Sequence, residues 1–146
     1  MRTDCRKGAL VFEQDYLMKM LLAFYQALFK SLQKVEEEDE DPEEAANTLD
    51  EVVGNAVGLD GTSLLSLSPE SIPQVLELSG TDPRVTEFVA RSLMLSSDYL
   101  AQAGQTQLSS LRLEQARAIA AHYGFEIPDN FKDISDLKEI AEGSDL

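Results

Sequence analysis

Cysteine and histidine are almost absent from this chain of 146 residues, which has one of each, Cys5 and His122. A single cysteine cannot form an internal disulfide, and one histidine with one distant cysteine excludes a structural zinc site of the usual kind. The charged residues Arg2, Asp4 and Arg6 stand where a secretory signal peptide needs an apolar segment. We therefore expect a reducing, cytoplasmic compartment.

Basic residues are also scarce, because 12 Lys and Arg face 27 Asp and Glu and give a formal net charge of −15. This balance disfavours nucleic acid, whose phosphates need Lys and Arg, and it disfavours general adhesion to anionic membranes. The run from Glu36 to Asp41 is entirely acidic. We interpret it as a solvated linker, with a docking site for a basic partner as the alternative.

No segment alternates Val, Ile and Thr, so the sequence predicts no sheet. Asp41-Pro42 and Asp82-Pro83 each combine a helix N-cap with a proline at the first helical position. Glycines follow the apolar runs as stop signals, while Gly54 falls inside one and is expected to weaken it. The predicted helices cover about 11–35, 42–57, a short segment ending near 78, 83–103, 107 or 110–123, and 135–141.

The fold class is therefore all-α, a helical bundle of about 5–6 helices. A long N-terminal helix packs with antiparallel helical hairpins in this prediction. We divide the chain into a flexible N-terminal arm at 1–9, a single helical domain at 10–142 with the acidic linker at 36–41, and a tail at 143–146. A chain of this length can bury a core without disulfides or metals.

The first long helix has an unusually wide apolar face, which spans about 220° where a surface helix needs about 100°. One neighbouring layer cannot cover such an arc. The helix must therefore be central in the fold, shared with a second copy, or immersed in lipid. Its candidate interaction face comprises Leu17, Met18, Met20, Leu21, Leu22, Phe24, Tyr25, Leu28, Phe29 and Leu32.

The sequence shows no recognisable catalytic apparatus. His122 lies on the polar side of its helix near the C-terminus, where the helix dipole favours a positive charge. Arg91 is placed on the polar face of the 83–103 helix, opposite the core. Calcium-loop and phosphate-loop spacings are absent. We expect no catalytic residue, no cofactor, no metal and no small-molecule ligand.

The segment from Phe12 to Met20, FEQDYLMKM, resembles the start of a family of small, uncharacterised bacterial helical proteins. Members open with a Phe-x-x-Asp-Tyr-Ile/Leu-Met/Leu-Arg helix, and Lys19 stands here where the family more often has Arg. The resemblance covers about the first quarter of the chain. It implies a helical fold and a cytoplasmic compartment, and it carries no function.

The stretch from Val85 to Pro128 resembles a tetratricopeptide unit. Tyr99, Leu100 and Gly104 resemble the end of its first helix and the turn, while Ala116, Ala120 and Pro128 resemble its second helix and terminal proline. The segment between Gly104 and Ala116 is about seven residues longer than in the usual repeat. An ordinary antiparallel helix pair is the alternative interpretation.

Taken together, these features favour a non-enzymatic protein-protein interaction or scaffolding module that self-associates through its first helix. The expected partner is a protein, including a second copy of the chain. One alternative is a membrane-surface or lipid-binding protein using the same helix, whose Lys19, Lys30 and Lys34 form a basic stripe. Another is a small-ligand binder or enzyme with an unrecognised site.

Overall fold

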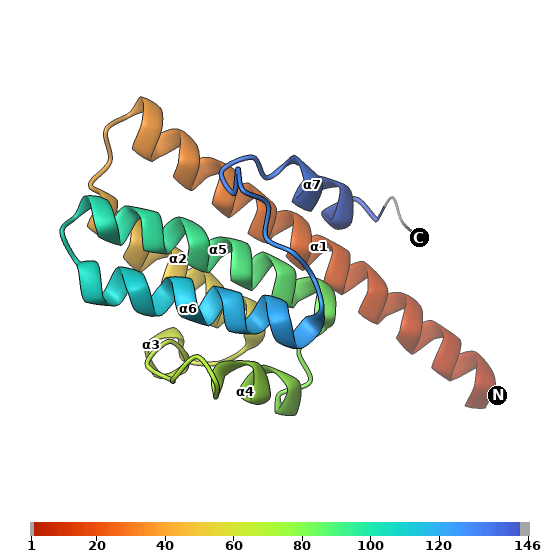
Figure 1. The fold of residues 1–146 in the computed structure, drawn as a ribbon. Coiled ribbons are helices and arrows are strands. Elements are labelled where there is room, and N and C mark those ends of the chain that lie inside the picture. Colours follow the sequence, from red (N-terminus) through yellow and green to blue (C-terminus); the bar gives the residue numbers. More distant parts are fainter. Residues whose placement is uncertain (1, 144–146) are drawn as a thin grey trace.

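The computed structural model describes residues 2–143, with side chains from residue 15 onward, and these residues form seven helices and no strand. The predicted all-α class is confirmed. Residues 144–146 of the predicted tail lie outside the described range. The helices are α1 (Arg2–Glu37), α2 (Pro42–Val57), α3 (Gly61–Leu64), α4 (Ile72–Leu78), α5 (Pro83–Gln102), α6 (Thr106–Tyr123) and α7 (Ser135–Ala141) (Figure 1).

The predicted helix starts and stops are present as hydrogen-bonded caps. The Asp41 carboxylate accepts a hydrogen bond from the backbone N–H of Glu43 at 3.2 Å, and Asp82 accepts one from Arg84 at 2.8 Å. Each cap is followed by a proline, which loses nothing at this position because the first N–H groups have no intrahelical partner. Gly124 ends α6 in the left-handed conformation with φ 75°, which glycine adopts without a steric penalty.

Helix α1 begins earlier than predicted. Residues 2–9 were expected to form a flexible arm, but they are the first turns of a continuous helix of 36 residues. This stretch contains no proline and a single glycine, and extending an existing helix adds one hydrogen bond per residue. At its other end α1 stops at Glu37, inside the predicted acidic linker, and Asp39 takes a left-handed φ of 54° before α2 begins.

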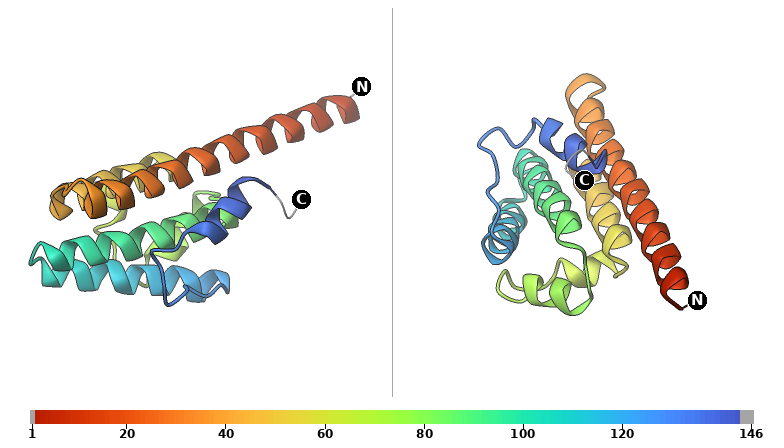
Figure 2. Two further views of the ribbon diagram at one scale, coloured as in Figure 1. Left: turned by 90° about the horizontal axis from the view of Figure 1, so that it is seen from above. Right: turned by 90° about the vertical axis from the view of Figure 1, so that its right-hand side faces the viewer.

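Helix α5 occupies the centre of the fold, since thirteen of its twenty residues are buried. It pairs with the antiparallel α6 and packs against α2 (Figure 1). Helix α1 forms an outer layer that contacts α2, α5 and α7, and its first turns extend past the other helices (Figure 2). The expectation that α1 could be central is therefore wrong, because α5 takes that place.

A close backbone contact joins α2 to α3. A Cβ added at Gly54 would lie 2.6 Å from the Gly61 backbone nitrogen, and one added at Gly61 would lie 2.6 Å from the Asp50 carbonyl oxygen. Gly54 was expected only to weaken its helix. The structure shows that both glycines let α3 start directly against α2, which fixes one wall of a cavity described below.

Candidate functional site

The inner face of α1 packs into the protein's own hydrophobic core. Leu21 and Leu28 are fully buried, and Phe24 and Leu32 are nearly so. The Phe24 ring packs against Phe88 of α5 with 5.5 Å between ring centroids. Four of the ten predicted interaction residues therefore hold α1 on the body and are not available to a partner.

The remaining six residues of the predicted face keep part of their surface accessible to solvent. Leu22 and Phe29 are exposed, with 39% and 52% of their surface accessible. The other four residues are partly buried: Leu17, Met18, Met20 and Tyr25. The predicted face is thus split by the packing of α2, α5 and α7 into a buried half and an accessible half.

The accessible half contains a regular apolar stripe. Met18, Leu22, Tyr25 and Phe29 follow one another at intervals of four, three and four residues, so they share one side of α1 within about 60° of arc. The rings of Tyr25 and Phe29 stack with centroids 6.3 Å apart. We call these four residues the α1 stripe.

At its C-terminal end the α1 stripe opens into a groove of about 380 Å³ between α1 and residues 132–135. Tyr25 and Phe29 line one side of this groove and Ile134 lines the other. Lys132 spans the groove's end, since its Nζ lies 3.9 Å from the Glu36 carboxylate on α1 and 3.4 Å from Asp98 on α5. The apolar surface of the stripe therefore continues into a shaped depression.

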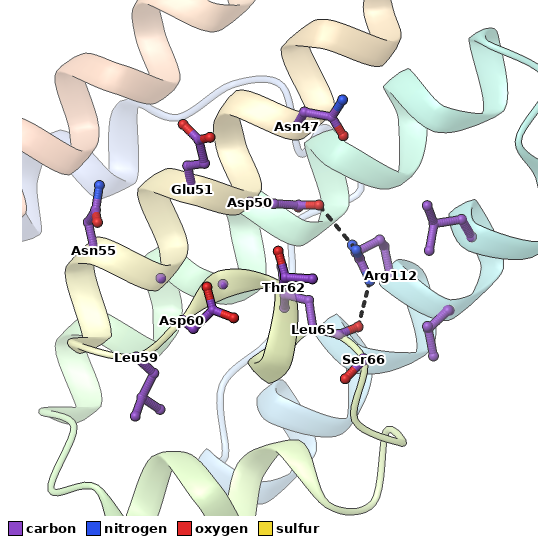
Figure 3. A pocket seen from close by; sticks show the side chains of 14 residues that line it. Asn47, Asp50, Glu51, Asn55, Leu59, Asp60, Thr62, Leu65, Ser66 and Arg112 are labelled. Atoms are coloured by element: carbon purple, nitrogen blue, oxygen red, sulfur yellow. Dashed lines mark hydrogen bonds and ion pairs between the residues drawn. The ribbon is translucent and has the colours of Figure 1, made fainter.

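A second feature is a larger, polar cavity of about 960 Å³ between α2, α3 and α6 (Figure 3). The Arg112 guanidinium from α6 donates to the Asp50 carboxylate of α2 at 3.1 Å and to the Leu65 carbonyl at 2.9 Å. Gln115 is fully buried and donates to the carbonyls of Leu65 and Leu67 at 3.0 and 2.9 Å. These bonds join α6 to α2 and to the segment that follows α3.

Burial sets the electrostatics of this network. Desolvation raises the pKa of the Asp50 carboxyl, while the adjacent Arg112 guanidinium and a weak hydrogen bond from Ser96 lower it. Within the described part of the chain, the Arg112 Nε has no hydrogen-bond partner, whereas both terminal nitrogens are bonded. The two innermost charged groups of the cavity wall, Asp50 and Arg112, are thus paired with each other.

The composition of this cavity does not resemble a small-molecule site. Such sites are mostly apolar with a few polar groups that converge on the ligand. Here the wall is mainly polar, and its innermost charges, Asp50 and Arg112, already bond to the protein. Asn47, Glu51 and Asn55 at its rim are exposed. The arrangement holds α2, α3 and α6 together, and the Asp60 carboxylate at the same wall accepts hydrogen bonds from the backbone N–H and the hydroxyl of Ser63 as the N-cap of α3.

Arg91 is the clearest error of the sequence prediction. It was placed on the polar face of α5, but only 2% of its surface is accessible. Its guanidinium pairs with the Asp136 carboxylate and donates to the backbone carbonyls of Asp133 at 2.7 Å and Phe131 at 3.4 Å. Arg91 therefore fixes the C-terminal segment and α7 to the centre of the fold.

The residues considered for chemistry are dispersed. His122 is exposed on α6 and lies 3.0 Å from the Glu77 carboxylate of α4, so it joins two helices. Cys5 lies outside the residues whose side chains are described. Among the described residues, no group of His, Cys, Asp and Glu is arranged to hold a metal ion. None of the described helices combines the length and apolar character needed to cross a membrane.

The buried network was missed although the sequence carries a signal for it. On a helix of 3.6 residues per turn, Arg112 and Gln115 fall on the same side as Ala116 and Ile119. That side is the buried one, whereas the apolar side chain of Leu113 is only partly covered. Helical spacing alone therefore indicated two buried polar residues on α6.

No protein-family model, curated protein sequence or solved structure matches this chain. The resemblance of residues 12–20 to uncharacterised bacterial proteins stays a prediction, as does the tetratricopeptide likeness of α5 and α6. The structure itself provides the antiparallel pairing of these two helices (Figure 1).

Proposed function

We propose that this protein is a non-enzymatic interaction module that self-associates through the α1 stripe. The observation that carries the proposal is that Leu22 and Phe29 stay exposed on a helix whose inner face already fills the core. Burying a large apolar side chain contributes about 1.5–3 kcal/mol. An exposed, regular row of such side chains is typical of a surface that meets another protein.

The spacing of the stripe supports a helical partner. Intervals of four, three and four residues are those of the apolar seam between two packed helices. The first turns of α1 extend past the rest of the molecule (Figure 2), so a second helix can approach this end without meeting the body. Met18 adds a flexible side chain that adapts to the surface it contacts.

Sedimentation velocity and light scattering over a micromolar concentration series test this proposal. We expect the wild-type protein to form a dimer or larger species, and the variant Leu22→Asp with Phe29→Asp to be monomeric. The matched control is Ala23→Asp with Gln26→Asp, which adds the same charge at exposed positions of α1 outside the stripe. This control should associate as the wild type does.

The choice of positions matters, because Leu21 and Leu28 are fully buried and their substitution would test folding instead. Circular dichroism of both variants should show unchanged helix content. A wild-type protein that stays monomeric throughout the concentration series would overturn the proposal. So would a stripe variant that associates as strongly as the control.

A further inference from the structure

Two copies of the α1 stripe can pack with their helices parallel or antiparallel, and the charges along α1 distinguish the two arrangements. The first turns of α1 carry Arg2, Arg6 and Lys7 against a single acidic residue, Asp4. The other end has one basic residue in its last turn, Lys34, followed by six consecutive acidic residues, Glu36 to Asp41, at the end of the helix and in the linker. The helix is therefore basic at its start and strongly acidic where it ends.

A parallel pair would place each acidic run against the same run of the partner. Six acidic residues from each chain would then lie together, and like charges at close range repel. An antiparallel pair instead brings the basic first turns of each helix to the acidic end of the other. The overall charge of −15 makes this choice important, because every dimer must overcome the repulsion between two acidic chains.

The apolar stripe and the charges agree on one antiparallel register. If the two-fold axis passes midway between Leu22 and Tyr25, these two residues face each other across the pair, and Met18 faces Phe29. In the same register the last residue of α1, Glu37, lies opposite position 10 of the other chain, so the basic first turns continue past that point, beside the acidic linker 38–41. In a symmetric dimer every such contact occurs twice.

We infer that the partner of the α1 stripe is a second copy of this chain, packed antiparallel in this register, with the basic first turns of each α1 against the acidic end of the other. The inference rests on the proposed self-association. It adds the orientation and the register, which the presence of a dimer alone does not give.

Disulfide trapping in a Cys5→Ser background tests the orientation. One preparation carries Met18→Cys and a second, larger by a fused tag, carries Phe29→Cys. After mild oxidation, we expect a cross-linked species of mixed size only when both preparations are combined, because Met18 meets Phe29 of the other chain. Rapid cross-linking of the Met18→Cys protein with itself would show a parallel pair and overturn the inference.

Charge exchange provides a second test that uses no cysteine. The variant Arg6→Glu with Lys7→Glu, and separately Glu38→Lys with Glu40→Lys, should each weaken the dimer by about tenfold or more. A chain carrying all four substitutions should recover an affinity near that of the wild type, because opposite charges again meet in the antiparallel pair. The matched control, Lys138→Glu with Arg117→Glu, changes the same number of charges at exposed positions outside α1.

The possible failures are distinguishable. A wild-type chain that is monomeric by light scattering removes both the proposed function and this inference. If the wild type dimerises but gives no mixed cross-link, only the antiparallel register is contradicted. The same holds if the chain with all four charge substitutions does not recover the affinity of the wild-type dimer. The stripe would then still be the site of association.

Discussion

Helices α1 and α5 are both long and both carry many apolar side chains, yet they are buried in opposite ways. On α5 even Arg91 has almost no accessible surface, and Ser92 and Ser96 are buried beside it. On α1 the large apolar side chains of Leu22 and Phe29 remain exposed. The central helix thus buries polar groups, while the outer helix exposes apolar ones.

The difference shows that covering neighbours, and not residue type alone, decide burial. A guanidinium can be buried where carboxylates and carbonyls bond to it, as the C-terminal segment does for Arg91 and as α2 and α3 do for Arg112. An apolar side chain stays exposed where no described element of the chain covers it. Our proposal assigns this second kind of surface on α1 to a partner outside the chain.

The largest difference in stability is expected between two variants that each remove one aromatic ring, one from the core and one from the exposed side of α1. Phe88→Ala should lower the free energy of unfolding by about 3–5 kcal/mol, because Phe88 is fully buried against Phe24. Phe29→Ala should lower it by less than about 1 kcal/mol in the dilute monomer, because half of that side chain is already in water. Urea titrations monitored by circular dichroism compare the two. Equal losses of unfolding free energy would mean that Phe29 is as important to the folded monomer as the core residue Phe88.

A smaller but still large effect is expected for the buried arginine of α6. Arg112→Ala should destabilise the protein by about 3 kcal/mol, since it leaves the Asp50 carboxylate without its ion-pair partner and removes the bonds of Arg112 to Leu65 and Gln115. Arg117→Ala on the same helix is the matched control, because Arg117 is exposed and should change stability by less than about 0.5 kcal/mol. If both variants lose the same stability, the buried network does not hold α2, α3 and α6 together.

Much of the fold could be predicted because the signals that begin and end helices are local. Asp41 and Asp82 cap helices whose N–H donors lie only two residues away. The start of α1 was missed because residues 2–9 mix good helix formers, such as Arg6, Lys7 and Ala9, with Gly8 and carry no cap signal, so their conformation depends on the helix that follows them. Local signals therefore located the helix ends that carry a cap and missed the start of α1, which carries none.

The candidate site was predictable only in outline. Helical spacing identified the apolar residues of α1, but Leu21 and Leu22 are neighbours in sequence and differ completely in burial. That difference depends on where α2, α5 and α7 pack. Apart from Gln115, the partners of Arg91 and Arg112 lie 40 or more residues away in the sequence, and three of them are backbone carbonyls, which every residue has. No local pattern specifies such contacts.

The smallest predicted effect is a pH dependence of stability that arises from Asp50, in the wall of the cavity between α2, α3 and α6. Burial raises the pKa of Asp50 above its ordinary value of 3.8, against the opposing influence of Arg112. A carboxyl with a higher pKa in the folded state binds its proton more tightly there. The folded state therefore gains stability as pH falls through the raised pKa toward 3.8, and this gain is absent at neutral pH.

We therefore expect the unfolding free energy of the wild type, relative to Asp50→Asn, to increase as the pH is lowered from neutral toward 3.8. Urea titrations of both proteins at a series of pH values measure this, and the subtraction cancels the acidic residues that the two share. A relative stability that decreases over the same range would show that the attraction of Arg112 outweighs the burial of Asp50. The attraction between the charges of Asp50 and Arg112 would then contribute to the folded state. The buried polar contacts between α2, α5 and α6 would in that case stabilise the fold by charge as well as by hydrogen bonding.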